Sequence, residues 1–181
     1  MKPLVYEMDA WSMATLPQLL GASLSLQPLL AMTQSDVPVL QVPFVVGDAV
    51  IELSNEWYTT PQGHDFHLPI LRPMEGLPTC YRAQQDGAAS SLAVIEAIEI
   101  LRRRSRDAEW QHGDQGGWAA SDETLIYDWG LNLLFTDGSA LSLVTEDDRI
   151  DGGWVVTPDR VRPSYQEEIW LIEVDIRERI A

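Results

Sequence analysis

The chain has 181 residues, a formal net charge of −16 and 45% hydrophobic residues, a composition that supports a packed core and argues against disorder. The negative charge disfavours nucleic acids and anionic membranes as partners, because binding phosphate groups depends on a surplus of Lys and Arg. The single cysteine, Cys80, excludes an internal disulfide framework and indicates a reducing compartment.

The N-terminal segment predicts neither a secretory signal nor a membrane anchor. Glu7 and Asp9 stand where a signal peptide carries positive charge. The apolar stretch 16–32 is interrupted by prolines and glutamines and lacks flanking Lys or Arg anchors. We therefore expect this stretch to pack against the body, with a short helix near residues 15–21, in a cytoplasmic protein.

Residues 60–90 contain four prolines and are predicted to be an extended connector that crosses the surface. Residues 91–104 fit two structures, since their apolar residues line one face of a helix, while the β-branched residues and the alternation in VIEAIEI favour a strand. We favour the strand. Alternation over residues 170–176 predicts a C-terminal strand.

The clearest predicted element is a half-buried strand over residues 125–135, in which apolar residues recur at every second position. A three-residue loop, 136–138, pairs Leu133 with Leu141 and keeps both leucines on the buried face. A two-residue loop would put them on opposite faces. The longer loop needs a residue with positive φ at its third place, which Gly138 occupies.

An earlier stretch, LQVPFVVGDAV at residues 40–50, resembles LNLLFTDGSAL at residues 131–141. The same loop geometry predicts Phe44 opposite Asp48 and Val42 opposite Val50, with Gly47 at the position of positive φ. Duplication of a unit of roughly 90 residues and convergence both explain the likeness. We favour convergence, because the halves do not align outside the hairpins.

These elements predict a mainly β or α+β fold whose antiparallel sheets are built on the two FxxG hairpins. The predicted units are an N-terminal β-rich subdomain, residues 1–88, which includes the connector, and a C-terminal antiparallel β subdomain, residues 89–181.

The residues that commonly carry catalysis are few. The chain has no HExxH, CxxC, GxSxG, P-loop or GxGxxG motif. A zinc site would need His64, His67, His112 and Cys80 to converge, and the loop HDFH is more typical of histidines that only form hydrogen bonds. We expect no catalytic residue, no bound metal and no cofactor.

The negative charge is concentrated between residues 107 and 159, which hold twelve acidic residues and one basic residue, Arg149. The densest cluster is TEDDRIDGGW, residues 145–154. Tryptophans follow Gly-Gly pairs in QGGW and DGGW, and an aromatic ring among acids suits the centre of a protein interface. The predicted partner-binding residues are Asp147, Asp148, Asp151, Trp154, Trp118 and Glu123.

A small acidic β-rich chain with the strand-turn-strand GLNLLFTDGSALSL and a following acidic loop resembles the bacterial immunity proteins of polymorphic-toxin and type VI secretion systems. The resemblance implies a non-catalytic inhibitor that binds and neutralises a toxin domain, and the charge agrees with a basic protein partner. It identifies neither the toxin nor the oligomeric state. Two other functions stay open: a small metal-dependent enzyme that uses the acidic loop with His64 and His67, and an acidic phage-type inhibitor or DNA mimic.

Overall fold

The structure is a computed structural model that describes residues 3–26, 29–31, 39–61, 63–76, 92–106, 108–111, 117–120, 124–145, 153–167 and 171–181. It consists mainly of β-strands. The elements, in chain order, are β1 (Leu4–Tyr6), α1 (Ala10–Thr15), η1 (Leu16–Leu19), β2 (Ser23–Ser25), β3 (Val42–Val46), β4 (Ala49–Thr59), β5 (Asp65–Met74), β6 (Leu92–Arg106), β7 (Ala108–Gln111), β8 (Gly117–Ala120), β9 (Leu125–Phe135), β10 (Ala140–Thr145), β11 (Trp154–Thr157), β12 (Ser164–Glu167) and β13 (Leu171–Ile180).

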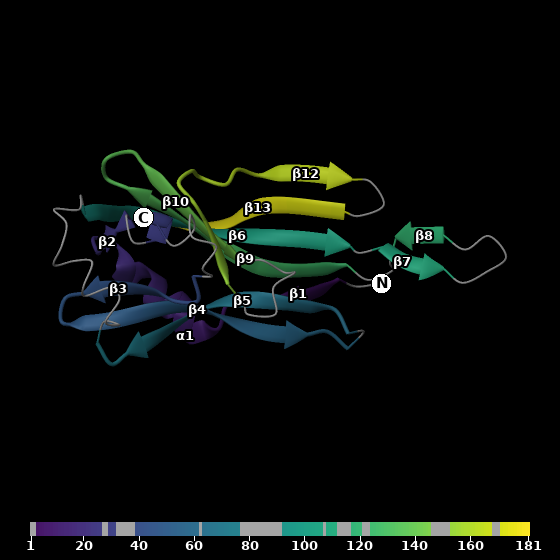
Figure 1. Cartoon of the computed structure of the whole chain (residues 1–181), viewed down its shortest axis with the longest axis horizontal. Helices are drawn as coiled ribbons and strands as arrows, with labels where there is room; N and C mark the ends of the chain where they lie inside the picture. The colour runs from purple at the N-terminus through teal and green to yellow at the C-terminus, as the bar shows by residue number, and fades with distance from the viewer. Residues whose placement is uncertain are drawn as a thin grey trace.

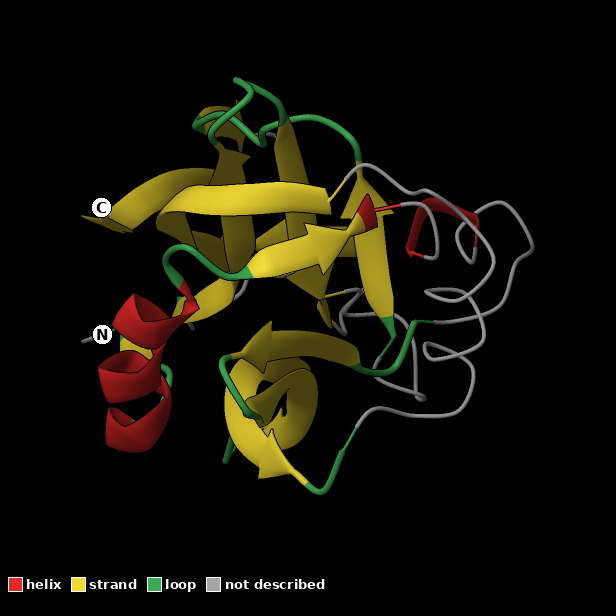
Figure 2. Ribbon diagram, turned by 90° about the vertical axis from the view of Figure 1, so that its left-hand side faces the viewer, coloured by secondary structure: helices red, strands yellow, loops and turns green. Residues whose placement is uncertain are grey.

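The strands form an 11-stranded sheet whose main path runs β11-β10-β9-β6-β2-β3-β4-β5. β1 joins this sheet beside β9, and β12 and β13 join it beside β6. β7 and β8 form a separate two-stranded sheet, which lies beyond the ends of β6 and β9 (Figure 1). α1 and η1 lie on one flank of the body of strands (Figure 2). The predicted β-rich, antiparallel fold is thus confirmed, with β1 and β9 as a parallel exception.

The hairpin of β9 and β10 has the predicted loop. Leu133 lies opposite Leu141 in the register. The N–H of Phe135 donates to the carbonyl of Ser139 at 3.0 Å, and the N–H of Gly138 donates back to the carbonyl of Phe135 at 3.0 Å. Gly138 has a φ of 84°, the conformation that the sequence assigned to it.

The predicted register of the first hairpin is wrong. Val42 lies opposite Leu53 and Phe44 opposite Ile51, so the loop between β3 and β4 has two residues instead of three. Gly47 does have a positive φ, of 60°. The buried residues of β4 explain the difference. Only the observed register places both Val42 and Phe44, whose side chains are buried, opposite apolar residues.

The three-residue loop of the β9–β10 hairpin recurs instead between β4 and β5. The N–H of Thr60 donates to the carbonyl of His64 at 2.8 Å, and the N–H of Gly63 donates to the carbonyl of Thr60 at 2.9 Å. Gly63 has a φ of 90°. The likeness between residues 40–50 and 131–141 therefore does not reflect a shared turn, and the choice between duplication and convergence stays a prediction.

The predicted connector contains a strand, β5, which pairs with β4 along its length. Its prolines are compatible with pairing because they lie at an edge. The N–H of Leu71 donates to Oγ of Ser12 in α1 at 2.9 Å, so odd-numbered residues of β5 direct their N–H groups away from β4. Pro69 and Pro73 share this orientation, and neither removes a hydrogen bond from the ladder.

β6 settles the ambiguity over residues 91–104 in favour of the strand, and β13 confirms the predicted C-terminal strand. β6 occupies a central position, since it pairs with β2, β9 and β13. A register shift near Leu101 in the β6–β9 pairing leaves Trp129 as the additional residue of β9. The shift places Arg102 of β6 opposite the buried Asp128 of β9.

The main core draws on both sides of the boundary predicted near residue 88. It combines Leu16, Leu19 and Phe44 with Ile98 and Leu133. A second apolar cluster joins β5 to β9. The division into two subdomains stays a prediction. In the described part of the chain, no helix combines the length and apolar character needed to cross a membrane.

Candidate protein-binding surface

Most of the predicted partner-binding residues lie outside the described residues: Asp147, Asp148, Asp151 and Glu123. Trp118 lies in β8, opposite Trp110 of β7 in the register. The two residues that flank the acidic segment 146–152 are held by the body of the protein. The indole Nε1–H of Trp129 donates to the carbonyl of Thr145 at 2.8 Å, and Nδ2 of Asn55 donates to the carbonyl of Gly153 at 3.5 Å.

Trp154 requires a correction, because the structure places it in the core and not at the surface. It begins β11, its side chain is 3% exposed, and it belongs to the main apolar cluster. Its N–H donates to the carbonyl of Val39 at 2.8 Å, and it lies opposite Thr145 in the register. Strand pairing on both sides holds the ring inside, so Trp154 is not available as an anchor for a partner.

The buried carboxylate of Asp128 binds one arginine from β6 and one from β13. Its side chain is 0% exposed. It accepts hydrogen bonds from Nη1 of Arg177 at 2.6 Å, from the N–H of Met8 at 2.8 Å and from Nη2 of Arg102 at 3.3 Å. Burial raises the pKa of Asp128, against the lowering effects of Met8 and the two arginines. Glu7 forms ion pairs with both arginines, so these charges are used within the fold.

A second buried carboxylate, Glu99, is 1% exposed and binds Arg160 through both oxygens, at 2.5 and 2.7 Å. Nδ2 of Asn132 donates to the same carboxylate at 3.0 Å, and Oγ of Ser142 donates to Oδ1 of Asn132 at 2.6 Å. The N–H of Val161 donates to that Oδ1 at 3.1 Å. This network fastens the segment after β11 onto the sheet.

Carboxylates of the same chain therefore engage most of the arginines. Among the described residues, the arginines in ion pairs are Arg72, Arg102, Arg104, Arg160, Arg177 and Arg179. Arg103 lies over the ring of Trp129, with its guanidinium carbon 5.5 Å from the ring centroid. The excess negative charge is consequently left to the surface.

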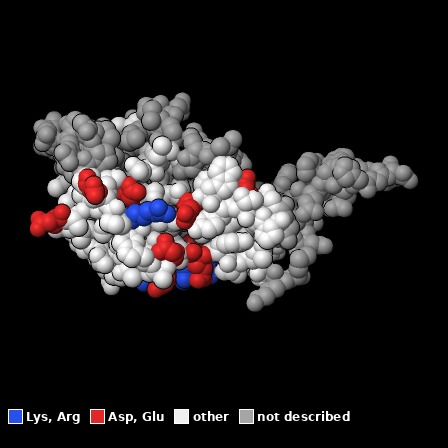
Figure 3. All heavy atoms as spheres, turned by 90° about the horizontal axis from the view of Figure 1, so that it is seen from below, with Lys and Arg blue, Asp and Glu red and all other residues white. Residues whose placement is uncertain are grey.

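The side of the molecule formed by α1, β4 and β5 shows this excess. Within the described residues from 3 to 76, the only basic residue is Arg72, and the acidic residues are Glu7, Asp9, Asp48, Glu52, Glu56, Asp65 and Glu75. Figure 3 shows acidic side chains spread over this face. A surface of this sign attracts basic proteins and repels polyanions.

On the hairpin of β4 and β5, four residues form an ordered cluster that the sequence did not predict. Trp57 lies opposite His67 and Thr59 opposite Asp65. The indole Nε1–H of Trp57 donates to Oγ1 of Thr59 at 3.3 Å, and that hydroxyl donates to Oδ1 of Asp65 at 2.6 Å. The hydroxyl of Thr59, followed by the Trp57 indole, holds the pKa of Asp65 below its ordinary value of 3.8. The carboxylate of Asp65 is therefore ionised at neutral pH.

The two rings of this cluster differ in exposure. Trp57 is 44% exposed, whereas His67 is 3% exposed, and their ring centroids are 5.5 Å apart at an interplanar angle of 59°. Nδ1 of His67 is buried and has no hydrogen-bond partner in the described structure. The mirror spacing of these residues about the turn in WYTTPQGHDFH was the available signal, but it required the β4–β5 register to be known.

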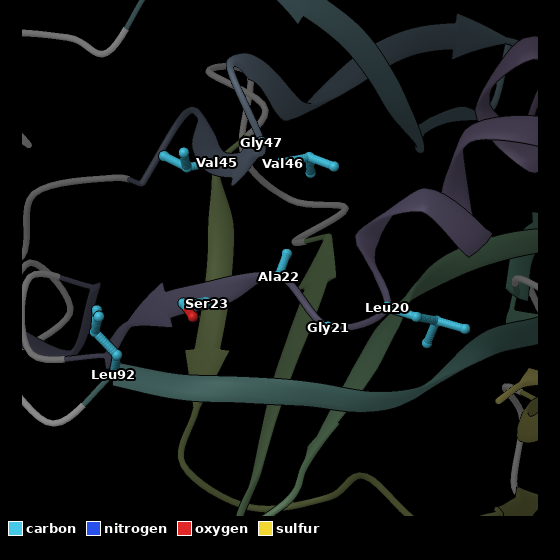
Figure 4. Close-up of a pocket in the computed structure, with 8 residues that line it drawn as sticks. All are labelled: Leu20, Gly21, Ala22, Ser23, Val45, Val46, Gly47 and Leu92. Atoms are coloured by element: carbon cyan, nitrogen blue, oxygen red, sulfur yellow. The ribbon is translucent and has the colours of Figure 1, made fainter.

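A separate apolar groove of about 590 Å³ lies where β2 and β3 diverge. The strands are joined there only by the Ser23–Val45 pair in the described register. Figure 4 shows Leu20 and Leu92 on opposite sides of the groove, with Val45 and Val46 above it. None of its lining residues carries a charge or a titratable side chain, so the groove offers apolar contact and no acid–base chemistry.

The metal hypothesis gains no support from the residues in view. Among them, no group of three or more His, Cys, Asp or Glu side chains could hold a metal ion. His64 and His67 lie near each other in sequence, but the N–H of His64 is bound to Thr60 and His67 packs against Trp57. Cys80 and His112, together with the acidic segment, lie outside the described residues.

Comparison with known proteins gives no relative for this chain. No family model, no curated protein and no solved structure matches it. Its function is therefore inferred from its own charges and contacts.

Proposed function

We propose that this protein is a non-catalytic, acidic inhibitor that binds a basic protein partner, in the manner of a bacterial immunity protein that neutralises a toxin. The observation that carries the proposal is the division of charge. The described arginines are largely engaged by carboxylates of the same chain, and the chain as a whole carries a net charge of −16. Long-range attraction between such a surface and a cationic partner accelerates their association.

The binding surface that we propose includes Asp147, Asp148 and Asp151, with Trp118 and Glu123 as further contributors. The segment that carries the three aspartates begins after Thr145 and ends before Gly153, and both flanking residues are held by hydrogen bonds to other strands.

The test is the association kinetics with the product of the adjacent gene, measured over a series of salt concentrations. Changing Asp147 and Asp148 to Lys should slow association by at least tenfold at low salt and flatten its salt dependence, because exposed charges are screened over about 8 Å at 0.15 M salt. Dissociation should change less than association.

The matched control reverses two exposed acids elsewhere, Glu96 in β6 and Glu178 in β13. This variant has the same net charge as the first one. If both variants slow association equally, the whole-molecule field acts and the acidic segment has no special role. If neither variant nor salt changes the rate, the acidic surface is only a solvated coat, and the proposal is wrong.

A further inference from the structure

We propose that Trp57, Asp65 and His67 form a docking point for an arginine side chain of the partner. This inference rests on the proposed function for the nature of the partner, but it identifies a site outside the acidic stretch 107–159. The docking point lies at the turn end of the β4–β5 hairpin. Its residues belong to two alternate pairs of the register, Trp57–His67 and Thr59–Asp65, and hence lie on one face of the hairpin.

The indole of Trp57 is held in place and still accessible. Its polar edge is tied to Thr59, and its ring packs against His67, while 44% of the residue is open to solvent. An exposed aromatic ring that is already ordered loses little conformational entropy when a ligand stacks on it. The planar guanidinium of arginine is the cation that stacks best on such a ring.

Asp65 supplies the charge. Five described carboxylates have an arginine partner, Glu7, Glu56, Glu99, Asp128 and Glu173, whereas no ion pair to Asp65 occurs among the described residues. The hydroxyl of Thr59 donates to Oδ1 of Asp65, and the Trp57 indole also favours the ionised form, which together leave oxygen lone pairs of the carboxylate available. A guanidinium over Trp57 would thus meet an ionised carboxylate that lacks an internal counter-charge.

His67 provides an independent indication of a ligand. Its Nδ1 is buried without a hydrogen-bond partner in the described structure, although buried polar atoms of native proteins are almost always paired. This nitrogen lies in the ring that packs against Trp57, beside the proposed docking point.

The face of β4 that carries the docking point also contacts the residue that follows the acidic segment. Asn55 precedes Trp57 by two positions on β4 and therefore shares its face of the strand, and it donates to the carbonyl of Gly153, the residue after the acidic segment. Gly153 is thus held on the face of β4 that carries the indole.

The experiment follows the indole N–H signals of the ¹⁵N-labelled protein by NMR during titration with N-acetyl-arginine amide. The titrant control is N-acetyl-citrulline amide, which has the same shape and no charge. Trp57→Phe and Trp11→Phe assign the two relevant signals. Trp11 is 47% exposed, and no hydrogen bond ties its indole to a carboxylate in the described structure, so it serves as the matched tryptophan.

We expect a saturable shift of the Trp57 signal with the arginine compound and a much smaller one with the citrulline compound. Asp65→Asn should weaken the apparent affinity by roughly two- to fivefold, whereas Asp175→Asn, at an exposed site on β13, should leave it unchanged. Equal shifts at Trp57 and Trp11, or equal responses to both titrants, would overturn the inference. Responses of equal size to the two titrants would identify a general stacking platform instead.

This outcome is distinguishable from that of the proposed function. If a basic partner binds with salt-dependent kinetics and Trp57→Ala leaves its dissociation rate unchanged, the docking point is wrong and the proposed function stands. If the arginine titration succeeds and no basic partner binds, the proposed function fails and the docking point stands as a cation-binding site.

Discussion

Replacing Gly138 by valine isolates the backbone geometry of the β9–β10 hairpin. Gly138 has a φ of +84°, and a Cβ atom added to it would meet no other atom within 4 Å. The substitution therefore creates no steric clash with the rest of the molecule. Its cost is the strain of an L-residue in the left-handed region, roughly 1–2 kcal/mol, with a β-branched side chain at the upper end.

We expect Gly138→Val to lower the free energy of unfolding by about 2 kcal/mol, which corresponds to a fall in Tm of roughly 4–8 °C for a chain of this size. Gly138→Asn should cost less than about 1 kcal/mol, because asparagine tolerates the left-handed conformation. Urea unfolding followed by tryptophan fluorescence measures both changes, provided that the slope with denaturant is the same in all three proteins.

The comparison between the two variants is decisive. A valine variant as stable as the parent protein would show that residue 138 does not have a positive φ. An asparagine variant as unstable as the valine variant would show that the loss comes from the side chain and not from the backbone conformation.

Further predictions concern stability at four other positions. Gly47→Val should cost about 1–2 kcal/mol, because Gly47 has a φ of +60° in open space, and an unchanged unfolding midpoint would refute the two-residue turn. Gly130→Ala should cost about 3 kcal/mol or prevent folding, since its Cβ would lie 2.8 Å from Cα of Val144 in the neighbouring strand; stability equal to that of the parent protein would contradict the close approach of β9 and β10. Trp154→Ala should lower stability by about 3–5 kcal/mol in urea unfolding, as expected for a buried ring, whereas an interface residue would leave stability unchanged. Asp9→Ala should cost about 1 kcal/mol near neutral pH through loss of the α1 N-cap. Partial burial raises the pKa of Asp9, but the hydrogen bonds from Ser12 outweigh this effect, and the pKa lies below its ordinary value of 3.8. The stability contributed by the N-cap is therefore fully present above pH 3.8 and should disappear as the pH falls through the lowered pKa. A stability difference that persists under acidic conditions would contradict the role of the carboxylate.

The central hairpin could be predicted because one physical constraint determined it. The leucines on the two strands of the β9–β10 hairpin must stay on the buried face, and only the three-residue loop ending at Gly138 achieves this. In the first hairpin, the same constraint was present in Ile51 and Leu53, whose buried side chains select the two-residue loop. The predicted register relied on the local likeness of the two turns and not on the alternation of buried residues in β4. It was therefore wrong.

Other features were hidden because their cause lies far away in the sequence. Pro69 and Pro73 are typical of connectors, and the donation from Leu71 to Ser12 shows that they face an edge where no strand pairs. The Gly-Gly pair before Trp154 is typical of a loop. In the structure, Trp154 forms a β-bridge with Val39, and its indole ring is buried. The excess of acidic residues could be counted from the sequence, but the engagement of the arginines depends on the register of β6, β9 and β13.

Protection against a toxin is the most direct test of the central claim, that this chain neutralises a basic protein partner. The measurement is the growth of cells that express the product of the adjacent gene, with and without this protein. We expect growth to be arrested by that product alone and restored by the parent protein, but not by the variant in which Asp147 and Asp148 are changed to Lys. Cells that grow normally without this protein, or that stay arrested when it is present in folded form, would contradict the account.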